Sequence, residues 1–201
     1  MRNKKIQNMV QTAALTAIIL VMSFTPLGYL RTAGLQISLL TVPVVIGAMV
    51  VGPVTGLILG LVFGFTSFYQ CFGMDAFGAA LLNINPIFTF LVCVPTRALV
   101  GWGTGMLFRA MKKIDKTHSI CYFAGGLLGA FLNTLLFMSA LILFFWNTDY
   151  MQTINQSMGN LNIFAFVAVF VGINAIFEII VSCLAGGGIS KILSHVVNRQ
   201  A

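Results

Sequence analysis

The chain has 201 residues, of which 59% are hydrophobic and 7% are charged, and its formal net charge is +7. Soluble domains carry about 25% charged residues, so this composition excludes a water-soluble globular protein and predicts an integral membrane protein. A membrane-spanning helix needs about 20 apolar residues, so the length allows roughly six or seven spans. We expect one membrane domain over residues 1–201, without a separate ATPase or sensor domain.

Hydropathy and helix-breaking residues divide the chain into six transmembrane helices, which predicts an all-α membrane fold. The first apolar run follows a basic start, as a signal peptide would. No small-residue cleavage site follows it, so we expect this run to be retained as a helix. Pro86 opens the fourth helix, because the first helical turn tolerates proline. The predicted helices cover residues 8–27, 39–52, 54–70, 86–111, 119–146 and 161–195.

The distribution of basic residues predicts the orientation. Six spans place both termini on one side of the membrane, and nine of the eleven basic residues then lie on that side. The positive-inside rule assigns this side to the cytoplasm. Basic residues that flank the anionic face of a membrane also account for the net charge, so no nucleic-acid partner is expected. The nine residues are Arg2, Lys4, Lys5, Arg109, Lys112, Lys113, Lys116, Lys191 and Arg199.

The sequence contains no motif for catalysis or metal binding. The four cysteines form no CxxC pair, and we expect them to act as small buried hydrophobes. His118 and His195 stand near predicted cytoplasmic helix ends without a second ligand. GxSxG, HExxH and P-loop motifs are absent. We therefore expect a protein that is not an enzyme and that needs no metal and no cofactor.

Small residues recur at four-residue spacing in two of the predicted helices. In "GLILGLVFG", Gly56, Gly60 and Gly64 form a stripe that lets a neighbouring helix approach closely. We interpret this stripe as packing within the bundle. Ala13 and Ala17 share the same spacing in the first helix. Such spacing is common in apolar helices, so a docking surface for a second membrane subunit needs other support.

Four polar residues lie deep inside the predicted spans. Arg97 is about 16 Å from the external end of its helix at 1.5 Å per residue. Asn133 and Asn174 each lie about 20 Å deep, and Glu178 follows Asn174 by one turn on the same helix face. A charge at the bilayer centre costs about 2.5–3.5 kcal/mol on insertion scales, so these residues need partners.

Two interpretations of this polar group stay open at the level of sequence. In the first, Arg97 and Glu178 form a buried ion pair, and the two asparagines bridge helices. In the second, the group lines a cavity open to the outside, and Arg97 receives a carboxylate, whose two oxygens match the paired N–H groups of a guanidinium. Both can hold together, with Glu178 orienting Arg97.

The predicted external loops contain further candidate ligand contacts. The loop at 28–38 contains Tyr29 and Gln36, and the loop at 71–85 contains Asp75, Asn83 and Asn85. Loops with glycine and amide side chains can close over a small polar solute and form hydrogen bonds with it. Ordinary connecting loops have a similar composition. The third external segment, 147–160, is polar and is also expected to be a loop.

Four stretches, in this order, resemble the substrate-binding S components of energy-coupling factor (ECF) transporters, and within that family the pantothenate type. Each motif is short and apolar, so their occurrence together carries the resemblance. Thr41, in place of a larger polar residue, and an arginine that follows "PT" depart from the pattern. The stretches are "VPVVIGAMVVGPVTGLILGLVFGFTS" (42–67), "NPIFTFLVCVPTRALVGWGTGMLF" (85–108), "NTLLF" (133–137) and "NAIFEII" (174–180).

The resemblance implies a function in vitamin uptake at the bacterial plasma membrane. An S component captures a small vitamin outside the cell and delivers it inward together with a membrane coupling subunit and two cytoplasmic ABC ATPases. It implies that Ala13 and Ala17 dock on the coupling subunit and that Arg97 binds the carboxylate of pantothenate. Asn133 and Asn174 would meet its neutral groups, and Glu178, Asn83 and Asn85 complete the expected site.

Two alternatives to pantothenate uptake remain at this stage. One is an S component for another small vitamin or vitamin precursor. The other, from a different class, is a membrane scaffold subunit without a ligand, in which Arg97 and Glu178 have only a structural role.

Overall fold

The computed structural model describes residues 4–25, 28–31, 36–114 and 120–199. Within these ranges, the side chains of residues 29–31, 36–37, 173–174 and 194–199 are not described. The predicted cytoplasmic residues Arg2, Lys116 and His118 therefore lie outside the described residues, and so do the side chains of His195 and Arg199.

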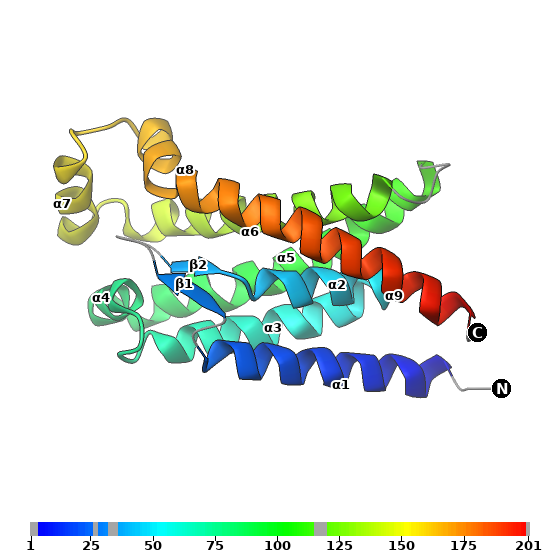
Figure 1. Cartoon of the computed structure of the whole chain (residues 1–201). Coiled ribbons are helices and arrows are strands. Elements are labelled where there is room, and N and C mark those ends of the chain that lie inside the picture. Colours follow the sequence, from blue (N-terminus) through cyan, green and yellow to red (C-terminus); the bar gives the residue numbers. More distant parts are fainter. Residues whose placement is uncertain (1–3, 26–27, 32–35, 115–119, 200–201) are drawn as a thin grey trace.

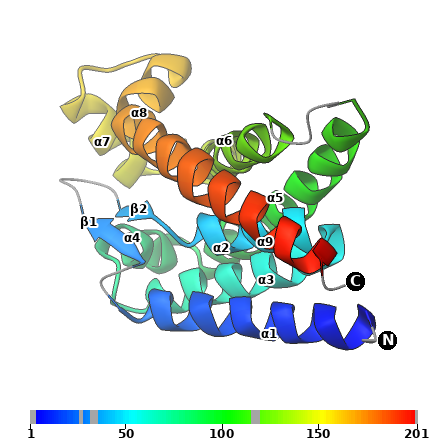
Figure 2. The same cartoon turned by 45° about the vertical axis from the view of Figure 1, so that its right-hand side comes forward.

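The described residues form an elongated bundle of helices with short elements gathered at one end (Figures 1 and 2). The start of α1 and the end of α9 lie together at the opposite end (Figure 1). The elements are α1 (Lys4–Ser23), β1 (Tyr29–Arg31), β2 (Gln36–Ser38), α2 (Thr41–Val50), α3 (Pro53–Gln70), α4 (Ala76–Ile84), α5 (Pro86–Ile114), α6 (Ile120–Phe145), α7 (Asp149–Ser157), α8 (Ile163–Val181), the π-helical turn η1 (Ser182–Gly187) and α9 (Gly188–Arg199).

The predicted helical membrane architecture is confirmed in its coarse form. Five helical segments of the described chain have the length and apolar composition needed to cross a membrane. The ten residues of α2 rise only about 15 Å, which is half of a hydrocarbon core of about 30 Å, so the count of six spans stays a prediction. The five segments are Lys4–Ser23, Pro53–Gln70, Pro86–Ile114, Ile120–Phe145 and Ala175–Leu193.

The three segments predicted as external loops contain secondary structure, which corrects the prediction. Helix α4 lies within 71–85, where the side chain of Asp75 accepts a hydrogen bond from Gly78 N at 2.9 Å and caps the helix. Helix α7 lies within 147–160 and is capped in the same way by Thr148. The segment at 28–38 contains the antiparallel pair β1–β2, so the fold is not strictly all-α. These segments contain glycines and polar residues, which are typical of loops, so the sequence did not predict the short elements.

The predicted helix at 161–195 runs as α8, η1 and α9, with its regular hydrogen bonding interrupted at Ser182–Gly187. This turn packs closely against α6. A side chain on Gly126 would collide with the backbone carbonyl of Ser182, and one on Gly187 would lie 2.9 Å from Phe123 Cα. Small residues thus permit backbone contact between the last helix and α6.

The predicted glycine stripe of α3 packs against α5. A Cβ on Gly56 would collide with the carbonyl of Gly101, and one on Gly60 with the carbonyl of Arg97. A Cβ on Gly64 would lie 2.8 Å from Val94 Cα. The two backbones therefore touch over two helical turns, and the interpretation of the stripe as packing within the bundle is confirmed.

Polar contacts join α1 to α3. The hydroxyl of Ser23 donates to Thr66 Oγ1 at 3.1 Å, and Gln70 Nε2 donates to the carbonyl of Ser23 at 2.7 Å. Further along the helices, the hydroxyls of Thr12 and Thr55 lie 3.3 Å apart. Most of α1 is nevertheless exposed, and many large apolar side chains cover the outside of the bundle, such as Leu143 at 76% exposure. A surface of this kind suits contact with lipid.

Replacement of Gly60 by alanine tests the α3–α5 contact. We expect Gly60→Ala to lower the melting temperature in detergent by about 5 °C, because overpacking costs about 1–3 kcal/mol. Gly172→Ala is the matched control, since a methyl group there meets no atom within 4 Å. It should melt at or above the wild-type temperature. A Gly60→Ala protein as stable as the wild type would contradict the close packing.

Candidate functional site

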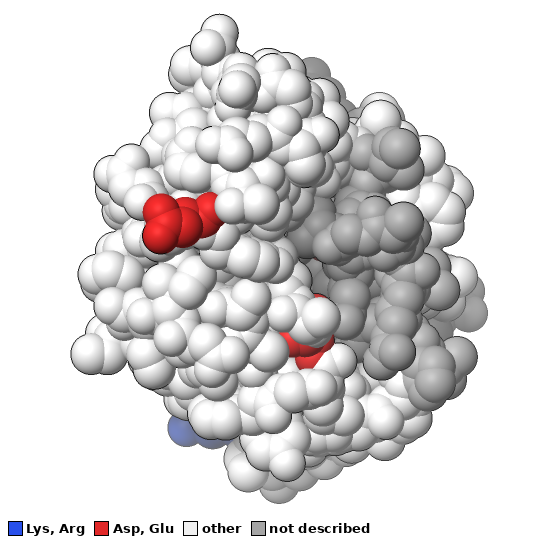
Figure 3. All heavy atoms as spheres, turned by 90° about the vertical axis from the view of Figure 1, so that its left-hand side faces the viewer, with Lys and Arg blue, Asp and Glu red and all other residues white. Residues whose placement is uncertain are grey.

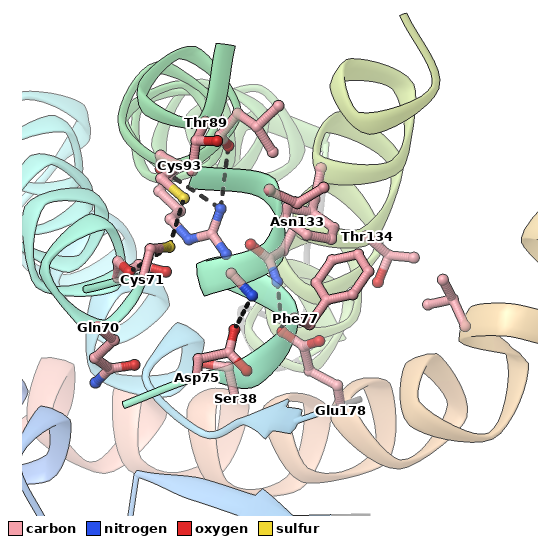
Figure 4. A pocket seen from close by; sticks show the side chains of 17 residues that line it. Ser38, Gln70, Cys71, Asp75, Phe77, Thr89, Cys93, Asn133, Thr134 and Glu178 are labelled. Atoms are coloured by element: carbon pink, nitrogen blue, oxygen red, sulfur yellow. Dashed lines mark hydrogen bonds between the residues drawn. The ribbon is translucent and has the colours of Figure 1, made fainter. Parts of the chain in front are cut away.

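A cavity of about 120 Å³ lies at the end of the bundle that holds α4, among residues of α3, α4, α5, α6 and α8 (Figure 4). The face of the molecule at this end is mostly uncharged, with acidic atoms visible inside a hollow (Figure 3). The cavity is smaller than the roughly 300–1,000 Å³ of sites for drug-sized ligands. Its size suits a small solute.

Arg97 of α5 lines this cavity, and its side chain turns back along its own helix. Nη1 donates to the carbonyl of Val92 at 3.2 Å, to the carbonyl of Cys93 at 3.5 Å and to Thr96 Oγ1 at 3.4 Å. Side chains on a helix lean toward its N-terminus, which for α5 is the end that faces the cavity. The guanidinium thus reaches the cavity from deep in the span.

Two aromatic rings lie against the guanidinium of Arg97. Its Cζ is 5.1 Å from the ring centroid of Phe63 on α3 and 5.0 Å from that of Phe137 on α6. Both distances are within the range of about 6 Å in which the negative face of a ring attracts a cation. We call Phe63 and Phe137 the aromatic clamp.

The Nε atom of the guanidinium has no hydrogen-bond partner in the part of the chain that the structure describes, although it is buried. The N–H bonds of Nε and Nη2 point in the same direction and form one of the two edges at which arginine binds a carboxylate through two hydrogen bonds. This edge can therefore accept an anionic group.

Glu178 lines the same cavity from α8, and other residues than Arg97 hold its carboxylate. Thr41 Oγ1 donates to Glu178 Oε1 at 2.5 Å, and Asn133 Nδ2 donates to the same oxygen at 2.8 Å. Figure 4 shows Asn133 and Glu178 pointing toward each other from neighbouring helices. Glu178 is only 8% exposed, so these hydrogen bonds compensate for lost hydration.

The two charged groups form no ion pair with each other, although both line the cavity. The first interpretation of the polar group required a buried Arg97–Glu178 ion pair, and the structure does not contain this pair. Asn133 takes the role of a bridge, because it joins α6 to α8 through Glu178. Its Oδ1 is buried without a hydrogen bond and stays available to a donor.

The other predicted contacts differ in position. The side chain of Asn174 lies outside the described residues, although its backbone is one turn before Glu178 in α8. Asn83 is exposed and does not line the cavity. Asn85 does not line it either, because its Oδ1 accepts from the backbone N–H groups of Ile87 and Phe88 and caps α5.

The sequence analysis did not identify several of the residues that line the cavity. The two phenylalanines of the aromatic clamp could not be recognised from the sequence, because phenylalanine is frequent in this chain and usually packs in a core. Thr41 stood out only as a departure from a family pattern, and its spatial neighbour Glu178 is 137 residues away in the chain. Further polar residues that line the cavity are Ser38, Ser67, Gln70, Thr89 and Thr134.

Helix α4 lines the cavity, and α7 contacts α4 through an aromatic pair. Phe77 lines the cavity and contacts the rings of Tyr150 and Phe170, at centroid distances of 6.2 and 5.8 Å. Burial raises the pKa of the Tyr150 hydroxyl, and the carboxylate of Asp75 raises it further, so this phenol is protonated at neutral pH. Of the two loops expected to close over a solute, the one at 71–85 is thus partly helical, as α4.

The cysteines contribute no metal site within the described chain. The sulfur atoms of Cys71 and Cys93 lie 4.0 Å apart in the cavity wall, and both residues are buried. No group of three histidine, cysteine or carboxylate side chains that could hold a metal ion occurs among the described residues.

Comparison with known proteins identifies the family. The family model described as "ECF transporter, substrate-specific component" matches residues 7–185. The chain belongs to this family. It is also 26% identical over 204 residues to a protein named pantothenate transporter PanT from Leuconostoc mesenteroides, with 99% of this chain and 98% of the relative covered. The resemblance seen in the sequence is therefore confirmed.

A second concave region of this S component lies on the outside of the bundle. It is a shallow groove between α1 and α3, lined by Thr12, Ala13, Thr16, Ala17 and Thr55 together with Asn8, Met9, Leu20 and Ile58. Ala13 and Ala17 are exposed. The predicted alanine stripe therefore lies on an open surface, away from the cavity that contains Arg97.

Replacement of Thr41 by valine tests how the S component holds Glu178. We expect Thr41→Val to lower the melting temperature in detergent by about 5 °C, because a hydrogen bond to a charged group contributes about 1.5–3 kcal/mol. Thr153→Val is the control, since that exposed hydroxyl donates only to the carbonyl of Asp149 in its own helix. Equal melting of both variants would contradict a stabilising role for Thr41.

Proposed function

We propose that this S component binds pantothenate in the cavity, with Arg97 holding the carboxylate, and that it serves as the vitamin-binding subunit of an ECF importer. The observation that carries the proposal is a cationic side chain that lines the cavity and whose buried Nε has no hydrogen-bond partner among the described residues. A carboxylate would bind the edge formed by Nε and Nη2 with two charge-assisted hydrogen bonds. The relative named as a pantothenate transporter supports the choice of vitamin.

The neutral part of the ligand would meet the other polar groups of the cavity. Pantothenate carries an amide and two hydroxyls besides its carboxylate. The buried Asn133 Oδ1 lacks a donor, and an amide N–H or a hydroxyl of the ligand would supply one. Glu178 can accept from a ligand hydroxyl, and Asn174, one turn away on α8, stays a predicted contact.

The transport role requires an orientation and partners. We infer that both termini face the cytoplasm of a bacterial cell and that the cavity opens to the outside. In support, Lys4, Lys5 and Lys191 belong to α1 and α9, whose outer ends lie opposite the α4 end (Figure 1). A membrane coupling subunit and two ABC ATPases, as in other ECF transporters, would drive delivery. The groove with Ala13 and Ala17 is the proposed docking surface.

The scaffold alternative requires that Arg97 be satisfied within the bundle. Instead, its Nε is buried without a partner, and Glu178 is held by other residues. A ligand explains this arrangement better than a structural pair. Another small acidic vitamin remains the competing ligand, and native mass spectrometry of gently purified protein would identify a bound acid by its mass.

Replacement of Arg97 by glutamine tests the proposed site. We expect Arg97→Gln to remain folded and to bind pantothenate about 100-fold more weakly in calorimetry, because it loses the charge and one of two paired donors. Arg109→Gln, at the other end of the same helix, is the matched control and should bind like the wild type. Unchanged affinity in folded Arg97→Gln would remove Arg97 from the site.

Leucine substitutions in the groove test the docking surface. Ala13→Leu with Ala17→Leu should keep pantothenate affinity and reduce uptake by proteoliposomes containing the coupling subunit and ATPases to background, because larger side chains prevent close helix contact. Ala14→Leu changes an exposed alanine outside the groove and should transport normally. Normal uptake by the double variant would rule out docking at this groove.

A further inference from the structure

We propose that the aromatic clamp, Phe63 and Phe137, determines the specificity of the cavity for a carboxylate over a neutral analogue. The two rings hold the guanidinium of Arg97 apart from Glu178, so that its Nε stays free of a hydrogen-bond partner within the described chain. This inference rests on the proposed function, in which the guanidinium receives the carboxylate of pantothenate. Phe63 and Phe137 are thus positioning residues that act through Arg97.

The first argument is the set of groups that stabilise the guanidinium. Its described partners are two backbone carbonyls, the hydroxyl of Thr96 and the two rings, and every one of them is neutral. Carbonyl dipoles and ring quadrupoles lower the energy of a buried cation without cancelling its charge. None of these contacts neutralises the positive charge of Arg97, which can therefore act on a ligand.

The second argument is the arrangement around Glu178. A carboxylate in the same cavity is the natural partner of a half-buried arginine, and an Arg97–Glu178 pair would occupy the guanidinium that the ligand needs. The structure keeps the two apart, with Oε1 of Glu178 bound by Thr41 and Asn133. The two rings of the clamp contact the guanidinium at 5.1 and 5.0 Å, and we infer that these contacts hold Arg97 away from Glu178.

The third argument is that the backbone fixes both rings. Gly60 lies against the carbonyl of Arg97, and Phe63 follows on the same face of α3 three residues later. Phe137 is one turn beyond Asn133 on α6, so it shares a helix face with a residue that binds Glu178. Phe63 is only 2% exposed, which leaves its ring little freedom to move.

A preorganised cation discriminates between ligands by charge. A carboxylate gains two charge-assisted hydrogen bonds without reorganisation of the site. The alcohol analogue panthenol, in which a hydroxymethyl group replaces the carboxylate, brings no negative charge to the guanidinium. Loss of the clamp should therefore weaken pantothenate binding and leave panthenol binding unchanged, whereas general damage to the cavity should weaken both.

Fluorinated phenylalanine provides a test that preserves shape. Fluorine withdraws charge from the ring face and weakens its attraction for a cation, while packing changes little. We expect trifluorophenylalanine at position 63 or 137 to weaken pantothenate binding about threefold to tenfold in calorimetry and to leave panthenol affinity within about twofold. The control is the same substitution at Phe108, a buried phenylalanine of a separate cluster that does not line the cavity, which should change neither affinity.

Leucine variants give a second measurement. Phe63→Leu and Phe137→Leu should each lower the ratio of pantothenate to panthenol affinity about tenfold, and Phe137→Tyr, which keeps a ring, should restore most of that ratio. Melting temperatures in detergent identify variants that are unfolded. If a leucine variant is unfolded, the fluorinated protein provides the test at that position, because its packing is preserved.

The outcomes separate the clamp from the proposed function. If the wild type binds neither pantothenate nor panthenol, the proposed function fails. If the wild type binds pantothenate and the fluorinated or leucine variants keep the wild-type affinity ratio, the clamp is overturned and the function stands. Equal weakening of both ligands would show that the rings only shape the cavity, and would also overturn the clamp.

Discussion

Close contact between the backbones of α3 and α5 is the constraint on which the candidate site depends. A Cβ on Gly60 would collide with the carbonyl oxygen of Arg97, so only glycine allows the two helices to approach at this level. The approach brings Phe63, in the next turn of α3, against the guanidinium of Arg97. Glycine packing, which contributes to stability in many membrane bundles, here also sets the surroundings of a half-buried charge.

The cavity keeps two opposite charges apart, and this separation has a physical cost. Arg97 and Glu178 would each gain from an ion pair, yet neutral groups hold both of them. Buried charges without counter-charges are rare, because hydration is lost and little replaces it. Such an arrangement is typical of a site that a ligand completes, and an acid with hydroxyl and amide groups would complement Arg97, Asn133 and Glu178 together.

Helix α3 connects the cavity to the outer groove. Gln70, at its end, lines the cavity and donates to the carbonyl of Ser23 on α1, while Thr55, near its start, meets Thr12 beside the groove. The proposed ligand site and the proposed docking surface thus lie on different faces and at different levels of the bundle, and share one rigid helix. Substitutions in the groove can therefore be separated from effects on ligand binding.

The sequence by itself determined the membrane class, the long helices and the depth of the polar residues, because hydropathy and helical rise depend only on local order along the chain. It brought Arg97, Asn133 and Glu178 to a similar depth, and the structure brings all three to one cavity. The sequence did not predict α4 and α7, because both helices lie in segments with glycines and polar residues that are typical of loops. Only the tertiary structure decided that Thr41 and Asn133, and not Arg97, bind Glu178, and that two phenylalanines flank the arginine. The reason is that residues far apart in the sequence, such as Thr41 and Glu178, meet only after the helices have packed.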